Sequence, residues 1–336
     1  MEYRKLGNSG LRVSPICLGT MMFGERTDAA EAGRIVDSAR AAGVNFIDTA
    51  DAYAKGESER VTGKLIARDR EHWVLATKVG NPMGKGPNEG GLSRAWLMRA
   101  IDASLQRLGT DWIDIYYFHL DDSTTPIEES LVAMAEIIGA GKARYFGVSN
   151  YRAWRIARIV EACDRLGVPA PIVSQPYYNA MNRMPETEIL PACASYGLGV
   201  VPYSPLARGV LTGKYAPGQA PAADTRAGHQ DKRMMETEFR EESMRLAQQL
   251  KAHAEQRGMS AGQFALNWVL NNRIVSSVLA GPRTLEQWTE YLGALDHAFS
   301  AEDESLVDSL VKSGHPSTPG FNDPKYPLIG RPTHSA

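Results

Sequence analysis

The feature that most constrains this 336-residue chain is a regular alternation of short apolar runs with longer amphipathic stretches. That alternation is typical of β-α units in a parallel sheet. We interpret eight runs as strands, at about residues 15–19, 44–48, 73–78, 113–118, 143–148, 171–174, 198–202 and 275–280. Eight strands close a barrel, and right-handed crossovers make them all parallel. The sequence therefore predicts an α/β fold, the (β/α)8 TIM barrel.

Three segments lie outside the eight units. Residues 3–13 are predicted to form a hairpin that turns at Asn8-Ser9-Gly10. The tail after Ser313 contains five prolines and no period, so we expect residues 313–336 to form an irregular extension packed on the barrel or partly mobile. The excursion after the seventh strand is predicted to be a loop at about 207–236 and helices at 237–257 and 261–271. No second domain is evident, and residues 1–336 are interpreted as one domain.

Composition limits the partners that this chain is expected to have. The formal net charge is −2, and no Lys/Arg cluster interleaves with aromatic residues, which argues against a nucleic-acid surface. Cys17, Cys163 and Cys193 are odd in number and lack metal-ligand spacing, so we expect reduced thiols, a cytoplasmic location and no metal. No apolar run approaches the ~18 residues of a membrane span, and the N-terminus opens no secretory signal. The expected partner is a small molecule, and the oligomeric state stays open.

Polar residues end several of the predicted strands. Asp48 ends the second, Lys78 ends the third and His119 directly follows the fourth, while Tyr53 lies five residues beyond Asp48. The carboxyl ends of barrel strands meet at one mouth, so these side chains are expected to meet there. A nearby ammonium favours phenolate and lowers the pKa of a tyrosine from its usual ~10. We expect Lys78 to do this to Tyr53, with Asp48 holding Lys78 charged.

The stretch Phe46 to Tyr53, reading FIDTADAY, with Gly56-Glu57-Ser58-Glu59 after it, resembles the aldo-keto reductases. The resemblance extends from the first residues to about Leu310. It implies that Asp48, Tyr53, Lys78 and His119 are the catalytic tetrad and that the N-terminal hairpin plugs the bottom of the barrel. It also implies reduction of an aldehyde or ketone by NADPH, with Tyr53 as general acid and His119 orienting the substrate oxygen.

The substrate site and its specificity are less constrained by the sequence. Met22 and Phe23 suggest an apolar wall near Tyr53 and His119, although packing explains them equally well. Specificity is expected from the loops at about 20–26, 79–92 and 207–236 and from the tail. The glycine-rich run from Val79 to Gly91 lacks the spacing of a phosphate loop and is interpreted as a substrate-side loop.

A nicotinamide site is expected at the ends of strands five to seven. Ser149, Asn150 and Gln175 carry a hydroxyl and two amides suited to a carboxamide, and Tyr203 offers a ring for stacking. The resemblance implies these roles. The alternative is that Ser149 and Asn150 merely cap a helix that begins near Tyr151.

The phosphates of the cofactor are expected after strands seven and eight, where barrels commonly bind them. The resemblance implies a pyrophosphate clamp after strand seven. Gly281-Pro282-Arg283-Thr284 follows strand eight and opens a helix, whose N-terminal amides are expected to attract a phosphate. Arg283 is placed for the 2′-phosphate, which favours NADP over NAD. Arg283 as a plain surface charge is the alternative. Tyr291 stands where many relatives have asparagine. The full set of expected cofactor residues is Gly19, Thr20, Met21, Asp48, Ser149, Asn150, Gln175, Tyr203, Ser204, Leu206, Gly209, Lys214, Arg226, Gly281, Arg283, Gln287, Glu290 and Tyr291.

Two other functions fit parts of this pattern. A lysine at a strand end can form a Schiff base, so an aldolase-like lyase acting through Lys78 is one alternative. The other is a non-catalytic NADP(H) sensor, because the β subunits of potassium channels share this fold and the wording from Tyr203 to Lys214. An intact tetrad does not distinguish the sensor from an enzyme.

Overall fold

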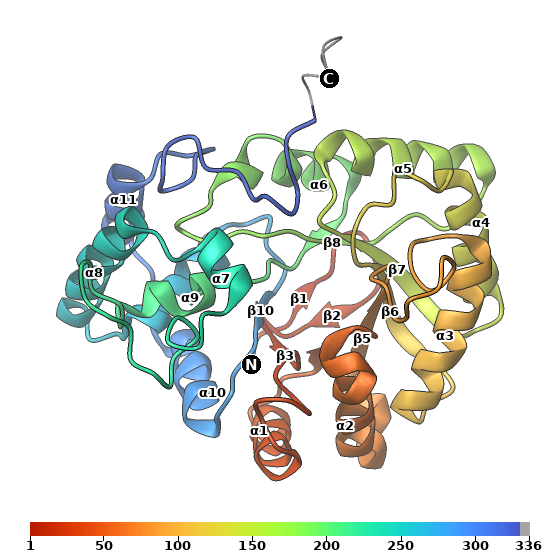
Figure 1. Ribbon diagram of the computed structural model, residues 1–336, viewed down its shortest axis with the longest axis horizontal. Helices are drawn as coiled ribbons and strands as arrows, with labels where there is room; N and C mark the ends of the chain where they lie inside the picture. Colours follow the sequence, from red (N-terminus) through yellow and green to blue (C-terminus); the bar gives the residue numbers. More distant parts are fainter. Residues whose placement is uncertain (330–336) are drawn as a thin grey trace.

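Eight short strands form one parallel sheet in a computed structural model that describes residues 1–329 (Figure 1). Neighbouring strands follow chain order, with β10 beside β3. The strands are β3 (Ile16–Gly19), β4 (Phe46–Asp48), β5 (Val74–Val79), β6 (Ile113–Phe118), β7 (Ala143–Ser149), β8 (Val173–Gln175), β9 (Gly199–Val200) and β10 (Val278–Ala280). A parallel bridge between Val200 and Val275 closes the sheet. The predicted (β/α)8 barrel is confirmed.

Helices surround the barrel and follow its strands (Figure 1). They are α1 (Ala29–Ala41), α2 (Glu57–Ile66), α3 (Arg94–Leu108), α4 (Ile127–Gly139), α5 (Ala153–Leu166), α6 (Ile189–Tyr196), α7 (Lys232–Thr237), α8 (Glu241–Gln256), α9 (Ala261–Asn271), α10 (Leu285–Leu292) and α11 (Ala301–Leu310). Local sequence defines several of their starts; Ser260 and Gln263, for example, form a reciprocal capping box at α9. None of the helices within residues 1–329 is long and apolar enough to cross a membrane.

Alternate residues along each strand point into the barrel. The interior cluster takes one residue in two from the strands, and includes Cys17, Phe46, Val74, Ala76, Ile115, Tyr117 and Val173. Two residues beyond Phe46 this series reaches Asp48, and two beyond Ala76 it reaches Lys78. The alternation that fills the interior with apolar residues therefore also places the side chains of Asp48 and Lys78 at the mouth, at the carboxyl-terminal ends of the strands.

The opposite end of the barrel is closed by the N-terminal hairpin. Its strands β1 (Arg4–Lys5) and β2 (Arg12–Val13) pair antiparallel. Leu6 and Val13 are fully buried in the interior cluster. The hairpin predicted at residues 3–13 is thus confirmed as a plug.

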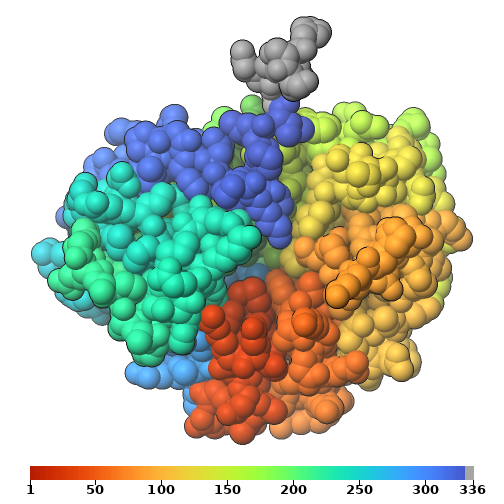
Figure 2. All heavy atoms as spheres, viewed as in Figure 1, coloured from red at the N-terminus to blue at the C-terminus, as the bar shows by residue number. Residues whose placement is uncertain are grey.

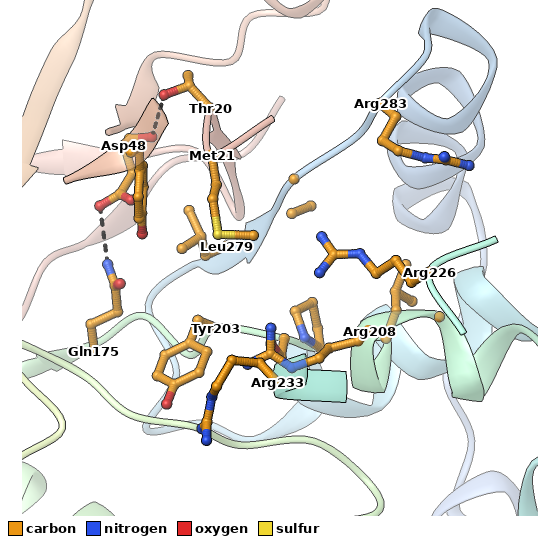
Figure 3. Close-up of a pocket in the computed structure, with 18 of the residues that line it drawn as sticks. Thr20, Met21, Asp48, Gln175, Tyr203, Arg208, Arg226, Arg233, Leu279 and Arg283 are labelled. Carbon is orange, nitrogen blue, oxygen red and sulfur yellow. Dashed lines mark hydrogen bonds between the residues drawn. The ribbon is translucent and has the colours of Figure 1, made fainter. Parts of the chain in front are cut away.

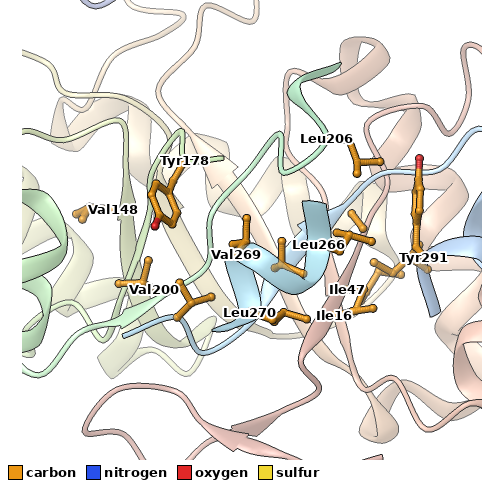
Figure 4. Packing of buried hydrophobic residues seen from close by; sticks show 14 of the residues in the cluster. Ile16, Ile47, Val148, Tyr178, Val200, Leu206, Leu266, Val269, Leu270 and Tyr291 are labelled. Atoms are coloured by element: carbon orange, nitrogen blue, oxygen red, sulfur yellow. The ribbon is translucent and has the colours of Figure 1, made fainter. Parts of the chain in front are cut away.

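A second and larger apolar cluster lies between the barrel and its helices (Figure 4). It joins outward-facing strand residues such as Ile16 and Ile47 to helix residues such as Leu266 and Val269. Each fully buried aliphatic side chain of this kind contributes roughly 1.5–3 kcal/mol. This packing holds the strand ends, and hence the mouth, in fixed positions.

The segment after β9 differs from its prediction in two respects. The loop expected at 207–236 contains a 3-10 helix (Ala207–Thr212) and most of α7, and the helix expected at 237–257 begins later, as α8 at Glu241. Between α7 and α8 the guanidinium of Arg240 donates to the carbonyl oxygen of Thr237, and Glu238 is buried. Arg240 Nε also donates to Thr318 Oγ1 at 2.8 Å, so a contact with the C-terminal segment, which helical periodicity does not reveal, helps to hold the residues between α7 and α8.

The C-terminal segment packs across the mouth of the barrel. Ser317 N donates to Met181 O at 2.8 Å, and Arg152 Nη2 donates to Tyr326 O at 2.7 Å. Asp323 pairs with Arg233 of α7 at 2.6 Å. Figure 2 shows this segment in dark blue beside the cyan helices, above a hollow at the centre of the face. It is irregular, as predicted, and its contacts with the barrel extend to Tyr326, whereas Leu328 and Ile329 are exposed. Residues 330–336 of the predicted extension lie outside the described residues.

Candidate active site

A cavity of about 550 Å³ opens at the carboxyl-terminal ends of the strands (Figure 3). Three of the four tetrad candidates, Asp48, Tyr53 and His119, line it. Lys78 lies beneath them with no solvent exposure. Every residue expected to bind the cofactor, from Gly19 through Tyr291, also lines this cavity. The structure thus brings together residues that the sequence spreads over more than 270 positions.

Lys78 is the centre of the tetrad's hydrogen bonding. Its ammonium donates to the carboxylate of Asp48, to Thr49 O at 2.7 Å and to the Tyr53 hydroxyl oxygen at 3.1 Å. Burial lowers the pKa of Lys78, but the Asp48 carboxylate and the Tyr53 oxygen outweigh it and raise that pKa above its usual value. Lys78 is therefore held as an ammonium at neutral pH.

The pKa of Tyr53 departs from expectation. Burial raises it above its usual value, and the ammonium of Lys78 only partly offsets that increase. The expectation that Lys78 brings the pKa of Tyr53 below its usual value was therefore wrong, because loss of solvent costs the phenolate more than one ammonium restores. Tyr53 carries its proton at neutral pH, the form that a general acid needs.

Backbone geometry holds Tyr53 in place. It begins a short 3-10 helix, Tyr53–Gly56, in which Ala54 and Lys55 have φ angles of 46° and 54°. This left-handed region is unfavourable for residues with a Cβ, and such strain costs of order 1–3 kcal/mol for each residue. The surrounding structure imposes this turn, which points to a constraint on where Tyr53 lies.

His119 is oriented by an amide. Asn81 Nδ2 lies 2.9 Å from His119 Nδ1, so when Asn81 donates this bond the ring proton is on Nε2. The rings of His119 and Tyr53 meet edge to face at 5.8 Å. Burial, Lys78 and Lys325 lower the pKa of His119 well below its usual value, so the imidazole is neutral. A neutral imidazole with Nε2–H is a hydrogen-bond donor beside the Tyr53 hydroxyl.

The residues expected at the nicotinamide are already connected to one another. Gln175 Nε2 donates to Asp48 Oδ2 at 3.0 Å, and Ser149 Oγ donates to Gln175 O at 2.9 Å. Tyr203 OH donates to Asn150 Oδ1 at 2.7 Å. The alternative that Ser149 and Asn150 cap a helix is wrong, because α5 begins at Ala153 without any side-chain cap.

Three basic residues line the other end of the cavity. Lys214 lies near enough to Arg283 and Arg226 that both lower its pKa, after the larger effect of burial. Figure 3 shows Arg226 and Arg283 on the side of the cavity away from Asp48. This end carries the charge that phosphate groups need.

The helix that follows β10 is less open to anions than the sequence predicts. Leu285 N, the first amide of α10, donates to the carboxylate of Glu31 at 2.6 Å. Gln287 Oε1 accepts from Arg283 N at 2.8 Å. The expectation that free amides of this helix bind a phosphate was therefore wrong, since α1 already supplies the anion. The guanidinium of Arg283 lines the cavity and is the group available there.

The residues expected near the adenine, Glu290 and Tyr291, combine a polar group and an aromatic ring. Glu290 accepts a hydrogen bond from Ser260 Oγ at 2.5 Å, which fixes its carboxylate. Tyr291 is 8% exposed and lines the cavity, so its ring offers a stacking surface.

Two substrate-site predictions do not hold. Met22 and Phe23 are 5% and 0% exposed and are not among the residues lining the cavity. They pack in the core, whereas their neighbour Met21 reaches the cavity.

The lining residues that sequence reasoning missed are Ala52, Asn81, Pro205, Arg208, Thr212, Arg233, Leu279, Ala280, Lys325 and Tyr326. Arg208 could have been identified because it lies in the sequence between Leu206 and Gly209, two residues expected to bind the cofactor. No sequence pattern marks Lys325 or Tyr326.

The donor set suits a dinucleotide. Amides and an aromatic ring lie at the tetrad end, and three cations lie at the far end, which matches a nicotinamide at one terminus and phosphates toward the other. The cavity volume is within the range of small-molecule sites. The residues present therefore fit NADP(H).

Comparison with known proteins agrees with this geometry. The sequence model of the Aldo/keto reductase family matches residues 15–312. The chain is 40% identical over 321 residues to a probable voltage-gated potassium channel subunit beta of Oryza sativa subsp. japonica, covering 93% of this chain and 97% of that protein. It is 35% identical over 329 residues to the L-glyceraldehyde 3-phosphate reductase of Escherichia coli O157:H7, covering 94% and 93%. It is also 35% identical over 332 residues to the oxidoreductase YrpG of Bacillus subtilis, covering 95% and 98%. With its barrel and the family match over most of its length, the chain belongs to the aldo/keto reductase family.

Proposed function

We propose that this protein reduces an aldehyde or ketone to the alcohol with NADPH. The observation that carries the proposal is the contact of Lys78 Nζ with the Tyr53 hydroxyl at 3.1 Å, at the bottom of a cavity lined by His119. A protonated phenol, a fixed ammonium and a neutral imidazole converge where a carbonyl oxygen can lie. Bound NADPH would supply the hydride for the carbonyl carbon.

The chain's own residues supply the proton and hold the oxygen. Tyr53 donates its proton to the carbonyl oxygen as general acid, and the ammonium of Lys78 stabilises the phenolate that remains. Asp48 keeps Lys78 charged, while His119 donates a hydrogen bond to the same oxygen. In the reverse direction Tyr53 accepts the proton of an alcohol.

The cofactor site is proposed for the residues that line the rest of the cavity. Ser149, Asn150 and Gln175 would hold the carboxamide, and Tyr203 would pack against the nicotinamide ring. Ser204, Leu206, Gly209 and Lys214, with Arg226, would hold the pyrophosphate. Arg283 would contact the 2′-phosphate, which favours NADP(H).

The test of this function is a screen of aldehydes and ketones with NADPH, followed by Tyr53→Phe. Loss of a general acid costs about 100-fold or more in turnover. We expect that loss in Tyr53→Phe with NADPH binding retained, and no loss in Tyr196→Phe, which changes an exposed tyrosine outside the cavity. Near-wild-type turnover by Tyr53→Phe would remove this residue from the mechanism.

A non-catalytic NADP(H) sensor is the second candidate. Its support is the 40% identity to a protein named as a probable channel β subunit. A protein that binds NADPH but reduces no carbonyl compound in the screen would favour the sensor.

The lyase alternative is weakened by the state of Lys78. An amine must be neutral to attack a carbonyl, whereas Lys78 is fully buried and its raised pKa keeps it charged. Borohydride with substrate should therefore leave no adduct on Lys78, while Lys78→Met should impair reduction.

The three cysteines are buried and free, which supports a reducing, cytoplasmic setting.

A further inference from the structure

The cavity is lined by more cations than the phosphates of the cofactor require. Lys214, Arg226 and Arg283 lie at the phosphate end described above. A second group of three, Arg208, Arg233 and Lys325, lines the same cavity. We call this second group the tetrad-side cation cluster. Burial is the main cause of the lowered pKa of Lys325, and its two neighbours in the cluster lower that pKa further.

The tetrad-side cation cluster lies near the catalytic candidates Tyr53 and His119. Figure 3 shows Arg208 and Arg233 beside Tyr203, with Arg283 farther away across the cavity. The ammonium of Lys325 is close enough to His119 to lower its pKa, after the larger effects of burial and Lys78. Arg208 likewise acts on Tyr53, where it is a minor influence on the pKa. These charges therefore face the part of the cavity in which the carbonyl compound would react.

Only one member of the cluster has carboxylate partners at close range. Arg233 pairs with Glu236 at 2.9 Å and with Asp323 at 2.6 Å. Within residues 1–329, no carboxylate lies within ion-pair distance of Arg208 or Lys325. Glu238 lies near enough to Arg208, and Asp323 near enough to Lys325, for their charges to interact, but neither carboxylate is in an ion pair with these two cations. Arg208 and Lys325 can therefore still attract an anion from solution.

The backbone keeps one of these two cations at the cavity. Ala207 and Arg208 have φ angles of 47° and 52°, in the left-handed region that such residues rarely adopt. Strain of this kind persists where surrounding structure imposes it, commonly at ligand sites. Arg208 Nε contacts Thr237 Oγ1 at 3.3 Å, which leaves the terminal nitrogens of the guanidinium free for another acceptor.

We propose that the carbonyl substrate carries a phosphate or a carboxylate, and that Lys325 and Arg208 bind this anionic group while the carbonyl oxygen lies at Tyr53 and His119. This inference rests on the proposed reductase function and specifies its substrate class. The C-terminal segment, through Lys325, thereby contributes to specificity. A neutral aldehyde of similar size would leave both cations without a partner.

The experiment compares matched pairs of aldehydes with NADPH. Glyceraldehyde 3-phosphate is compared with glyceraldehyde, and 4-carboxybenzaldehyde with benzaldehyde, so that the two pairs separate a phosphate preference from a carboxylate preference. We expect the anionic member of at least one pair to have a kcat/KM about tenfold higher or more, the effect of one charge-assisted contact. Equal values within both pairs would overturn the inference, while reduction of the neutral aldehydes would leave the proposed function standing.

Variants assign the preference to particular residues. Lys325→Met and Arg208→Met should each lower the ratio of anionic to neutral kcat/KM about tenfold. Lys312→Met changes an exposed lysine outside the cavity and should leave the ratio unaltered. If Lys325→Met weakens NADPH binding tenfold and leaves the ratio intact, Lys325 serves the cofactor and the inference fails.

A binding measurement tests the site without turnover. Titration calorimetry of the NADP+-saturated protein with inorganic phosphate and with benzoate should detect one site, weakened about tenfold in Lys325→Met. Failure of both anions to bind the wild-type protein would overturn the inference. Anion binding without any carbonyl reduction would instead sustain the anion site and reject the reductase function.

Discussion

At the scale of single residues, Asp51 is a buried carboxyl beside the tetrad with no role in its hydrogen bonds. It is 1% exposed, and neither of its oxygens has a hydrogen-bond partner within residues 1–329. Its neighbour Glu59, by contrast, accepts from Thr77 and from Arg107, each at 2.6 Å. Burial, reinforced by the charge of Glu59, raises the pKa of Asp51 to about 7.

That raised pKa makes the stability of the protein depend on pH. In the unfolded chain the Asp51 carboxyl ionises near pH ~4, whereas in the folded protein it keeps its proton to about 7. Between these values the folded state binds more protons, so the contribution of Asp51 to the free energy of unfolding falls as pH rises. Asp51→Asn should therefore stabilise by roughly 2–4 kcal/mol at about pH 8 and by little near pH 4. Urea unfolding at both pH values checks this, with exposed Asp111→Asn as control; equal effects at both pH values would contradict it.

Arg283 is proposed to determine cofactor choice. Its guanidinium makes one long bond, 3.4 Å to Asp224 O, and is otherwise available to a phosphate. A charge-assisted contact to phosphate is worth roughly 1.5–3 kcal/mol. Arg283→Ala should weaken NADPH binding by about ten- to a hundredfold and leave NADH binding nearly unchanged. Fluorescence titration with both cofactors measures this, and Arg273→Ala, outside the cavity, serves as control; equal losses for both cofactors would show that Arg283 does not read the 2′-phosphate.

At the scale of elements, the barrel interior depends on a glycine in β7. A Cβ at Gly147 would lie 2.6 Å from both Tyr117 Cε1 and Val173 Cγ1, side chains of the two neighbouring strands. Glycine here lets the Tyr117 ring occupy the interior below the tetrad.

Gly147→Ala should therefore destabilise the protein by about 1–3 kcal/mol, the usual cost of overpacking a core. Gly139, the last residue of α4, is the matched control because a Cβ there meets nothing within 4 Å. Gly139→Ala should be neutral or stabilise by up to about 1 kcal/mol, since alanine is the better helix residue. Chemical unfolding of both variants compares the two, and equal stabilities would disprove the packing explanation.

Much of the element layout could be predicted from the sequence because strand and helix periods are local properties. Asp48, Lys78 and His119 followed from their places at strand ends. Asn81 could not be predicted in this way, since its role depends on which side chain of another strand's loop it meets. Lys325 also escaped prediction because an irregular tail has no period that fixes its course, and Met22 was misassigned because loop residues next to a cavity can point into the core.

At the scale of the whole molecule, charge is unevenly distributed. The chain has a formal net charge of −2, yet among residues 1–329 six basic and two acidic side chains line the cavity. A concave site of one sign concentrates the field and raises the association rate of ligands of opposite charge. The rest of the chain is then net negative, so anionic ligands are attracted chiefly at the cavity.

The association rate of NADPH should therefore fall steeply with added salt. The Debye length shortens from about 30 Å at 0.01 M to about 10 Å at 0.1 M ionic strength, which screens the cavity's charges from an approaching ligand. We expect the association rate constant to drop by about tenfold or more over this range, the lower end for a steered encounter. Stopped-flow measurement of protein fluorescence on mixing with NADPH gives this constant directly. NADH, which lacks the 2′-phosphate and its charge, should show a weaker salt dependence. A rate constant for NADPH that is independent of salt would mean that the basic residues act only after contact, through hydrogen bonds, and do not guide the cofactor to the barrel mouth.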